Sequence, residues 1–403
     1  MTVRSAAGEK NATAPPLAGV RMLDFTHIVA GPFGTRILAD LGAEVLHVET
    51  QTRTAGVGVH VGRRDVRVDR NKRSITLNLK HDAGRATAIR LASVADVIVE
   101  NFSAGVMARL GLDYDMLQPA NPGLIYVSMS GFGHTGPRRD WTSMNMNLQG
   151  YSGLMLVTGR EGDPPTPISN SWNDFIASLH AAFAILQALL ERKRTGQGRF
   201  LDLAQAECSI ATLGGVVLAA VVSGQDPPRL GNRSTSVAPQ GVYACAGTDQ
   251  WCAISVQTDQ QWRALCGVMG KPTLAADARF ASVVGRLRHH DEIDEQIRAW
   301  MRERSKEAVQ SQLAAAGVPA ERVRHADAVV NSADSGQVFK WVEVPGLGKP
   351  DLAAGLPFAL SRSQTFEPES PPAIGAHTRP ALREWIGLSD AEIDQLDAAG
   401  ALI

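Results

Sequence analysis

The chain has 403 residues, 44% of them hydrophobic and 20% charged, which is typical of a globular protein long enough for two domains. Its formal net charge of −1 argues against a nucleic acid or an anionic membrane as the main partner. The four cysteines form no C-x-x-C pair and no zinc-finger spacing, so we expect reduced thiols and a cytoplasmic location.

Residues 1–15 contain no apolar core, which excludes a signal peptide and predicts a disordered tail. From Val20 onward, short apolar runs alternate with helical patterns, which predicts an α/β fold with a parallel sheet and helices on both faces. The expected strands are Val20–Phe25, Glu44–Val48, Ser74–Leu79, Asp96–Val99, Leu124–Met129 and Phe200–Leu203. The expected helices are Pro32–Leu41, Ala83–Val94, Asp174–Leu190 and Gln205–Val222.

The strongest helical pattern is Asp174–Leu190, where apolar residues recur at helical spacing and Gly196 provides a stop. The apolar stretch at 214–222 is too short to span a bilayer, which needs about 20 residues.

A Gly-, Pro- and Ser-rich segment after Gly224 indicates a linker, and residues 225–340 are predicted to form a second, smaller domain. Its expected elements are the strands Val242–Ala244 and Trp251–Val256 and the helices Gln260–Met269 and Ile293–Ala315. The tail from Trp341 is Pro-rich, and its last helix opens with the capping box Ser389–Glu392.

Two segments before Asp174 are candidates for binding phosphate. In Asp24–Gly34, two glycines flank Pro32 at a predicted helix start, where free N–H groups suit an anion; the alternative is a tight turn that only packs the helix. Asn71-Lys72-Arg73 offers two adjacent cations that could hold a phosphate, or a solvated loop.

Asp174 is the candidate nucleophile. It stands where the long helix begins, so it is expected to act as the N-cap, with a lowered pKa that keeps it ionised. The alternative is that it caps the backbone and does nothing more. The functional hypothesis is that this carboxylate attacks an acyl group, with helix N–H groups stabilising the oxyanion.

Motifs for several other chemistries are missing from the sequence. The ten histidines form no H-x-x-x-H pair, no carboxylate cluster suits a metal, and neither a Walker A motif nor a G-x-S-x-G elbow is present. No metal and no tightly bound cofactor is therefore expected.

Several long segments resemble the family III CoA-transferases, which include formyl-CoA transferase, carnitine CoA-transferase and α-methylacyl-CoA racemase. They lie in the family's order along almost the whole chain. They are PLAGVRMLDFTHIVAGPFGTRILADLGAEVLHVE, NKRSITLNLK, ADVIVENFSAGVMARLGL, NPGLIYVSMSGFGHTGP, SGLMLVTG, ALLERKRTGQGRFLDLA and IGAHTRPALREWIGLSDAEIDQL.

This resemblance implies a Rossmann-like large domain, built from residues 16–224 and a C-terminal return over 341–403, and an interlocked homodimer. It implies CoA transfer from an acyl-CoA donor to a carboxylic acid through aspartyl anhydride and aspartyl-CoA thioester intermediates. Asp174 matches the family's nucleophile. The matches to CoA-binding positions are His27, Ile28, Val29, Ala30, Leu77, Lys80, Asn101, Phe102, Ser103 and Arg109.

The chain also departs at several positions from the family that it resembles. Val29 replaces the glutamine of formyl-CoA transferase, Asn173 precedes Asp174 where glycine is frequent, and no glycine-rich shielding loop is obvious near Gly231–Gly241. Met144 stands where the racemase has its acid/base histidine, which argues against racemisation.

Two alternatives to the transferase stay open. One is a 2-methylacyl-CoA isomerase that uses Asp174 together with His27 or His134, and the other is a non-catalytic subunit of a heteromeric CoA-transferase. The methionines 144, 146 and 155 and Trp172 would suit an apolar acyl group, or belong to an ordinary core.

Overall fold

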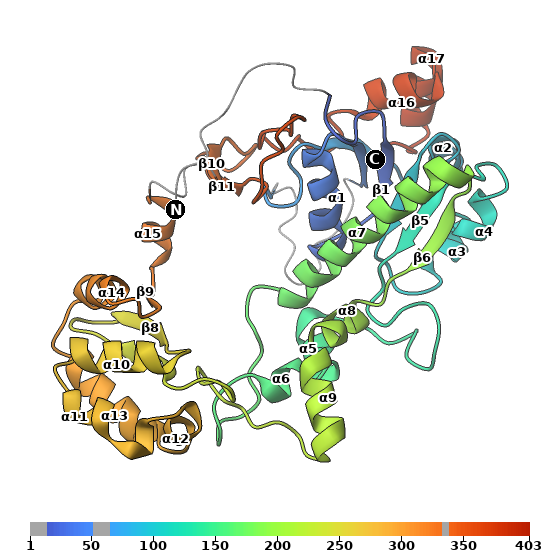
Figure 1. Cartoon of the computed structure of the whole chain (residues 1–403). Coiled ribbons are helices and arrows are strands. Elements are labelled where there is room, and N and C mark those ends of the chain that lie inside the picture. The colour runs from blue at the N-terminus through green and yellow to red at the C-terminus, as the bar shows by residue number, and fades with distance from the viewer. Residues whose placement is uncertain (1–13, 51–64, 333–337) are drawn as a thin grey trace. The chain divides into compact units, whose positions relative to one another are not determined.

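A computed structural model describes residues 14–50, 65–332 and 338–403 (Figure 1). The chain divides into two compact units. Unit 1 is Met1–Leu156, Pro167–Gln225 and Ala333–Ile403, and unit 2 is Val157–Thr166 and Asp226–Ser332. The domain boundaries expected at 225 and 341 stay predictions, and the tail expected over 1–15 lies outside the described residues except for 14 and 15.

Unit 1 is built on a six-stranded sheet in which every neighbouring pair is parallel, so the predicted α/β architecture is confirmed. The strand order is β3-β2-β1-β4-β5-β6. Strands β2 and β3 are added on one side of β1 and strands β4 to β6 on the other, so the strand order reverses between β1 and β4, as in doubly wound nucleotide-binding folds. The strands are β1 (Arg21–Asp24), β2 (Glu44–Glu49), β3 (Arg73–Thr76), β4 (Val97–Glu100), β5 (Ile125–Ser128) and β6 (Arg199–Asp202).

Helices cover both faces of this sheet (Figure 1). The helices of unit 1 and its boundary are α1 (Ala30–Asp40), α2 (Asp82–Ala92), α3 (Val106–Leu110), α4 (Tyr114–Leu117), α5 (Asn145–Tyr151), α6 (Leu154–Val157), α7 (Trp172–Thr195), α8 (Gln205–Thr212), α9 (Gly214–Ser223), α16 (Thr378–Ile386) and α17 (Asp390–Ala398). A hairpin of β10 (Phe339–Val342) and β11 (Asp351–Ala354) completes unit 1.

Two apolar clusters hold the helices to the sheet. On one face, Leu91 of α2 and Leu382 of α16 belong to the same cluster as Ile98 of β4. On the other face, Leu38 of α1 and Ile185 of α7 belong to the cluster of β1, β2, β4 and β5. The central strands are apolar and buried because both of their faces are covered.

Two helices that were predicted as continuous are each divided into two in the structure. The predicted helix Gln205–Val222 breaks before Gly214, and α8 and α9 are bent by 67° where Leu213 leaves helical geometry. The predicted helix Ile293–Ala315 is likewise two helices, because Ser305 accepts a hydrogen bond from Ala308 N (3.2 Å) and caps a new start. The predicted capping box of Ser389 and Glu392 is confirmed.

Helix α7 packs on α1 through small residues rather than through its largest ones. Its buried positions include Ala177, Ser178 and Ala181, whereas Phe183 is 72% exposed and Leu190 is 66% exposed. The predicted apolar stripe is therefore divided between the core and an outer face. By length and composition α7 could span a membrane, a test that core helices also pass, and its contacts with α1 and the sheet place it in the core.

Unit 2 has its own core around Trp262, Phe280 and Leu313. Its antiparallel sheet has the order β7-β8-β9, with β7 (Gln240–Ala244), β8 (Trp251–Ser255) and β9 (Ala320–Arg322). Its helices are α10 (Asp259–Val268), α11 (Pro272–Ala276), the 3-10 helix η1 (Ala278–Phe280), α12 (Val283–Arg288), α13 (His290–Met301), α14 (Lys306–Ala315) and α15 (Ala326–Val330).

All four cysteines of the chain are free and buried.

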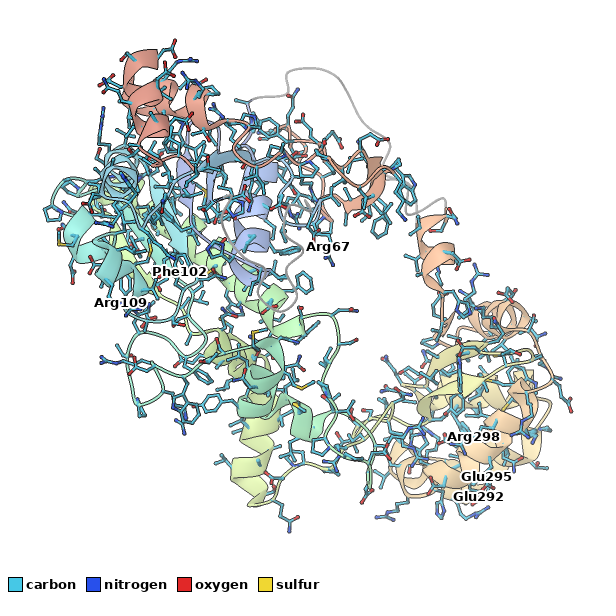
Figure 2. All side chains as sticks on the ribbon, turned by 180° about the vertical axis from the view of Figure 1, so that it is seen from behind. Arg67, Phe102, Arg109, Glu292, Glu295 and Arg298 are labelled. Atoms are coloured by element: carbon cyan, nitrogen blue, oxygen red, sulfur yellow. The ribbon has the colours of Figure 1, made fainter. Side chains whose placement is uncertain are left out.

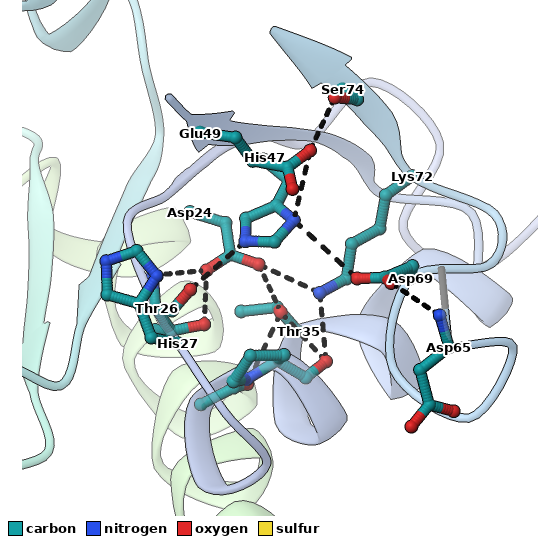
Figure 3. A network of polar contacts seen from close by, with 12 residues as sticks. Asp24, Thr26, His27, Thr35, His47, Glu49, Asp65, Asp69, Lys72 and Ser74 are labelled. Atoms are coloured by element: carbon teal, nitrogen blue, oxygen red, sulfur yellow. Dashed lines mark hydrogen bonds and ion pairs between the residues drawn. The ribbon is translucent and has the colours of Figure 1, made fainter. Parts of the chain in front are cut away.

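A buried polar network joins the end of β1 to α1 and to the segment before β3 (Figure 3). Asp24 is fully buried and accepts hydrogen bonds from Thr35 (2.6 Å) and from Lys72 Nζ (2.9 Å). Lys72 Nζ also donates to the carbonyl of Pro32 (2.9 Å) in α1. Burial alone would raise the pKa of Asp24, but Lys72 and the other polar neighbours outweigh it and hold that pKa well below its usual range.

We predict that Lys72→Met destabilises the protein by about 3 to 5 kcal/mol at neutral pH, because it leaves a buried carboxylate without its cation. Urea unfolding measures the change. The neighbouring Arg73→Met is the control; it removes partly exposed contacts with Glu44 and Glu384 and should cost no more than about 1 kcal/mol. Equal losses in the two variants would contradict the role given to the buried pair.

Candidate functional site

The turn between β1 and α1 projects residues from the carboxyl edge of the sheet. Ile28 has φ 69°, a strained value for a β-branched residue, and its side chain is 53% exposed. The side chain of Asn101, which follows β4, holds this turn at two points: its Oδ1 accepts from His27 N (2.8 Å) and its Nδ2 donates to His27 O (2.8 Å). The turn therefore lies between β1 and β4, where the strand order reverses and doubly wound folds bind ligands.

Gly31 and Gly34, in the first turns of α1, lie where neighbouring atoms leave little room for a side chain. A Cβ on Gly31 would overlap the side chain of Thr26, at 2.2 Å from its Cβ, and a Cβ on Gly34 would come within 3.1 Å of Ser178 O in α7. Both positions thus serve close approach of the backbone, which is the packing alternative considered for this segment.

The prediction that Asn71-Lys72-Arg73 binds a phosphate is wrong. Lys72 is buried against Asp24, Arg73 pairs with Glu44 and Glu384, and Asn71 Nδ2 donates to Asp40 (2.8 Å). These cations are neutralised by acidic partners that lie up to 311 residues away in the chain.

The remaining predicted CoA contacts differ in what they offer a ligand. Phe102 packs edge-on against the ring of His27, with centroids 5.0 Å apart, and in Figure 2 it appears at the same edge as Arg109. Arg109 and Lys80 are exposed cations, and Ser103 is also exposed. Leu77 is 2% exposed and belongs to the core, so its side chain contributes packing rather than a surface for ligand.

Asp174 lies in the first turn of α7 but is not its N-cap. The helix begins at Trp172, with Ser171 as the cap residue, and Asp174 N donates to Ser171 O (2.9 Å). Asp174 is half-buried, and burial raises its pKa to about 6, against the lowering effect of the Ser171 hydroxyl. The expected lowered pKa is therefore wrong, because desolvation outweighs hydrogen bonding at this carboxyl.

A hydroxyl one turn along α7 ties Asp174 to the β1–α1 turn. Ser178 is fully buried, and its Oγ hydrogen-bonds the carbonyl oxygens of Ala30 and of Asp174 (2.6 Å to the latter). Beside it, Phe33 of α1 and Phe175 of α7 pack edge to face with centroids 4.8 Å apart. The structure thus brings Asp174 and the turn His27–Ala30 together on two packed helices.

The N–H groups at the start of α7 are largely occupied. Asn173 N donates to Asn145 Oδ1 (3.2 Å), and Asp174 N and Phe175 N both donate to Ser171 O. These three amides are therefore unsuited to stabilise an oxyanion in this arrangement, contrary to the expectation from the sequence.

A second cluster of polar residues lies at the ends of β4 and β5, beside a cavity of about 410 Å³. His134 Nε2 lies 2.5 Å from Ser128 Oγ and 3.9 Å from Glu100. Burial raises the pKa of Glu100 to about 7, and hydrogen bonds from Ser128 and from Phe102 N oppose the rise. His134 is thus already engaged by polar neighbours of the sheet edge.

Sequence reasoning missed the amides around Asp174. Gln149 is fully buried, and Asn145 and Asn173 are linked by the hydrogen bond described above. Asn145 and Gln149 are four residues apart in α5, a spacing that places two amides on one helix face and could have indicated a polar contact. Met144, immediately before them, is 54% exposed.

The described residues hold no group of three or more His, Cys, Asp or Glu side chains that could bind a metal ion. Exposed cations suitable for phosphates are Lys80 and Arg109, as noted above. The arrangement can therefore present a carboxylate to a ligand held along the carboxyl edge of the sheet.

Comparison with known proteins gives a consistent result. The sequence model of CoA-transferase family III matches residues 17–378. The succinyl-CoA–D-citramalate CoA-transferase of Chloroflexus aurantiacus is 34% identical, over 95% of this chain and 97% of that protein. The succinyl-CoA–L-malate CoA-transferase beta subunit of the same organism is 30% identical, over 95% of this chain and 97% of that protein. A CAIB/BAIF family protein from Brucella suis superposes with a TM-score of 0.82 at 30% identity. The match covers 93% of this chain and 100% of the chain from Brucella suis.

We predict that Asp174→Asn stabilises the protein more at pH 8 than at pH 5. The pKa of Asp174 is about 6 in the fold against 3.8 for the ordinary group, so the folded state loses stability as the pH rises from 3.8 to about 6 and does not regain it above that pH. Removing this cost should raise the free energy of unfolding by about 1 to 2 kcal/mol at pH 8, after allowance for the partial exposure of Asp174. Urea unfolding at both pH values measures it.

The control for that experiment is Asp140→Asn, which changes an exposed carboxylate of the same unit and should alter stability by no more than about 0.5 kcal/mol. A loss of stability in Asp174→Asn at pH 8 would contradict the raised pKa.

Proposed function

The chain belongs to family III of the CoA-transferases and is an acyl-CoA:carboxylate CoA-transferase, and we propose that Asp174 carries CoA transfer as its nucleophile. The observation that supports this role is the half-buried carboxylate of Asp174, a residue whose backbone carbonyl shares the Ser178 hydroxyl with the carbonyl of Ala30 in the turn His27–Ala30. A carboxylate with a pKa of about 6 is ionised at neutral pH and more basic than an ordinary aspartate, which favours nucleophilic attack.

The proposed reaction runs through covalent intermediates on this one side chain. The Asp174 carboxylate attacks the thioester carbonyl, the C–S bond breaks, and an aspartyl anhydride and CoA thiolate form. The thiolate attacks the aspartyl carbonyl and releases the donor acid, which leaves an aspartyl-CoA thioester. The acceptor carboxylate then attacks the carbonyl of the aspartyl-CoA thioester, whose C–S bond breaks to give a second anhydride and CoA thiolate. This thiolate attacks the acyl carbon of the acceptor, the anhydride C–O bond breaks, and the new acyl-CoA and free Asp174 carboxylate are released. Because an anhydride hydrolyses readily, these steps need a site that excludes water.

CoA is a substrate of this enzyme, and we assign its contacts to the carboxyl edge of the sheet. The turn His27–Ala30 would receive the pantetheine and thiol end, and Asn101, Phe102 and Ser103 would border the nucleotide. Lys80 and Arg109 are the exposed cations suited to its phosphates. Asn101 acts indirectly, because its amide is already used to hold His27.

The Asp174→Ala variant tests the nucleophile. We expect loss of transfer by at least about 1,000-fold, with CoA binding by calorimetry changed little, because the β1–α1 turn is untouched. Donors and acceptors should come from a panel that includes succinyl-CoA, D-citramalate, L-malate and apolar acids. Hydroxylamine should trap wild-type Asp174 during turnover. Full transfer activity of Asp174→Ala would remove the proposal.

We further propose that the chain acts in the cytoplasm as a homodimer, with a second copy covering the outer faces of α7 and α9. Helix α9 is strongly apolar but has no buried residue, and Val221 and Val222 are 76% and 78% exposed. Phe183 and Leu190 are exposed apolar residues on α7. Contiguous exposed apolar residues of this kind mark protein interfaces.

Light scattering tests this assembly. The wild type should show twice the 43.0 kDa chain mass, and Phe183→Asp should shift it toward the monomer by placing a charge in the apolar contact. Met116→Asp is the matched control, since Met116 is 64% exposed, close to the 72% of Phe183, but lies on α4. A monomeric wild type, or a Phe183→Asp variant as dimeric as the control, would contradict the proposal.

A further inference from the structure

Two consecutive residues before α7 have a left-handed backbone although neither is glycine. Asn170 has φ 63° and Ser171 has φ 55°. Such strain persists where neighbouring contacts hold the backbone, and it is concentrated at functional sites. Asp174 N donates to the backbone carbonyl of Ser171 (2.9 Å), and the Ser171 hydroxyl lowers the pKa of the Asp174 carboxyl against the larger effect of burial. The direction of the nucleophile therefore depends on this turn.

The turn is held from α5 on its upstream side. Gln149 is fully buried, and its side chain pairs with both backbone groups of Ile168: Oε1 accepts from Ile168 N (2.8 Å) and Nε2 donates to Ile168 O (2.8 Å). Ile168 lies two residues before Asn170. A buried amide that satisfies a donor and an acceptor of one residue fixes that residue as a strand partner would.

The same amide also holds the turn on its downstream side. Gln149 Nε2 lies 3.1 Å from Asn145 Oδ1, and this oxygen accepts from Asn173 N (3.2 Å). Asn173 is itself fully buried, and its Oδ1 accepts from the hydroxyl of Ser209 in α8. Helix α5 thus fastens the strained turn at Ile168 and at Asn173, on both sides of Asn170–Ser171.

We propose that Gln149 is a positioning residue for CoA transfer, which holds the turn Asn170–Ser171 and, through it, the carboxylate of Asp174 in its attacking direction. This inference rests on the proposed role of Asp174. Gln149 lies outside the carboxyl-edge turn assigned to CoA. Its replacement should therefore lower the rate of the chemical steps and leave the binding of the donor largely unchanged.

Gln149→Met tests the proposal, because methionine has a similar volume and removes all three hydrogen bonds. With succinyl-CoA as donor, kcat should fall about 10- to 100-fold, the loss typical of a misplaced reacting group, while KM for the donor changes less than about threefold. The acid limb of the pH profile should move below its wild-type position near pH 6, since a loosened Asp174 gains water.

Asn121→Leu is the matched control. The Asn121 amide also bonds two backbone carbonyls, those of Ala92 (3.1 Å) and Ala95 (2.8 Å), but it lies toward the opposite end of α7, where Arg192 contacts Gly123. Residues 174 and 192 are separated by roughly 27 Å along the helix. This variant should lose thermal stability and keep both kcat and the acid limb of the wild type.

A second variant keeps the test decisive if Gln149→Met does not fold. Asn145→Ala alters a half-buried side chain and removes the acceptor for Asn173 N, so it should show the same separation of kcat from KM. A kcat within threefold of wild type in the folded variants overturns the positioning role. If Asp174→Ala is inactive while Gln149→Met is fully active, only this inference fails; a fully active Asp174→Ala overturns both proposals.

Discussion

The close crossing of α1 and α7 is the contact on which the site depends. Glycine at position 34 favours this crossing, because a Cβ there would lie 3.1 Å from Ser178 O, closer than most Cβ contacts. It lets the Ser178 hydroxyl reach the carbonyl of Ala30, so the end of the β1–α1 turn and the first turns of α7 share one hydrogen bond. The small residues Ala177 and Ala181 keep this interface tight. The distance between the turn and Asp174 is thus set by packed backbone rather than by flexible side chains.

Two buried aspartates illustrate how environment decides the role of a carboxylate. Asp24 is fully buried, but Lys72 and two threonine hydroxyls keep it ionised, and it serves to join β1, α1 and the segment before β3. Asp174 is less buried, and the Ser171 hydroxyl only partly offsets the cost of desolvation, so its pKa rises to about 6. A carboxylate with satisfied partners is inert, whereas one with few partners is available for reaction.

Helix α7 connects the proposed chemistry to the proposed assembly. Its inner face packs on α1 and the sheet, and its outer face carries Phe183 and Leu190 in exposed positions. If a second copy covers that outer face, dimer formation also restrains the helix that carries Asp174. Helix α9, which follows α7 after β6 and α8, carries the other apolar surface assigned to the proposed dimer.

The period of the apolar residues, and the segments shared with the family, were enough to predict the parallel α/β sheet, its six strands and the family of the chain. These properties are local or repeated along the chain, and so a single sequence contains them. Helix breaks were less predictable, because a run such as Gln205–Val222 stays apolar across the bend before Gly214. The residue types of the candidate site were also visible, since the turn His27–Ala30 lies in a segment that resembles the family and Asp174 matches the position of the family's nucleophile.

What only the tertiary structure decided is how those residues are held. Asn101 bonds His27 from 74 residues away, Ser178 bonds Ala30 from 148, and Gln149 bonds Ile168 from 19. The same packing makes Ser171 rather than Asp174 the cap of α7 and raises the pKa of Asp174 instead of lowering it. Hydrogen-bond partners and desolvation depend on which distant segments meet, and that information appears only when the chain is folded.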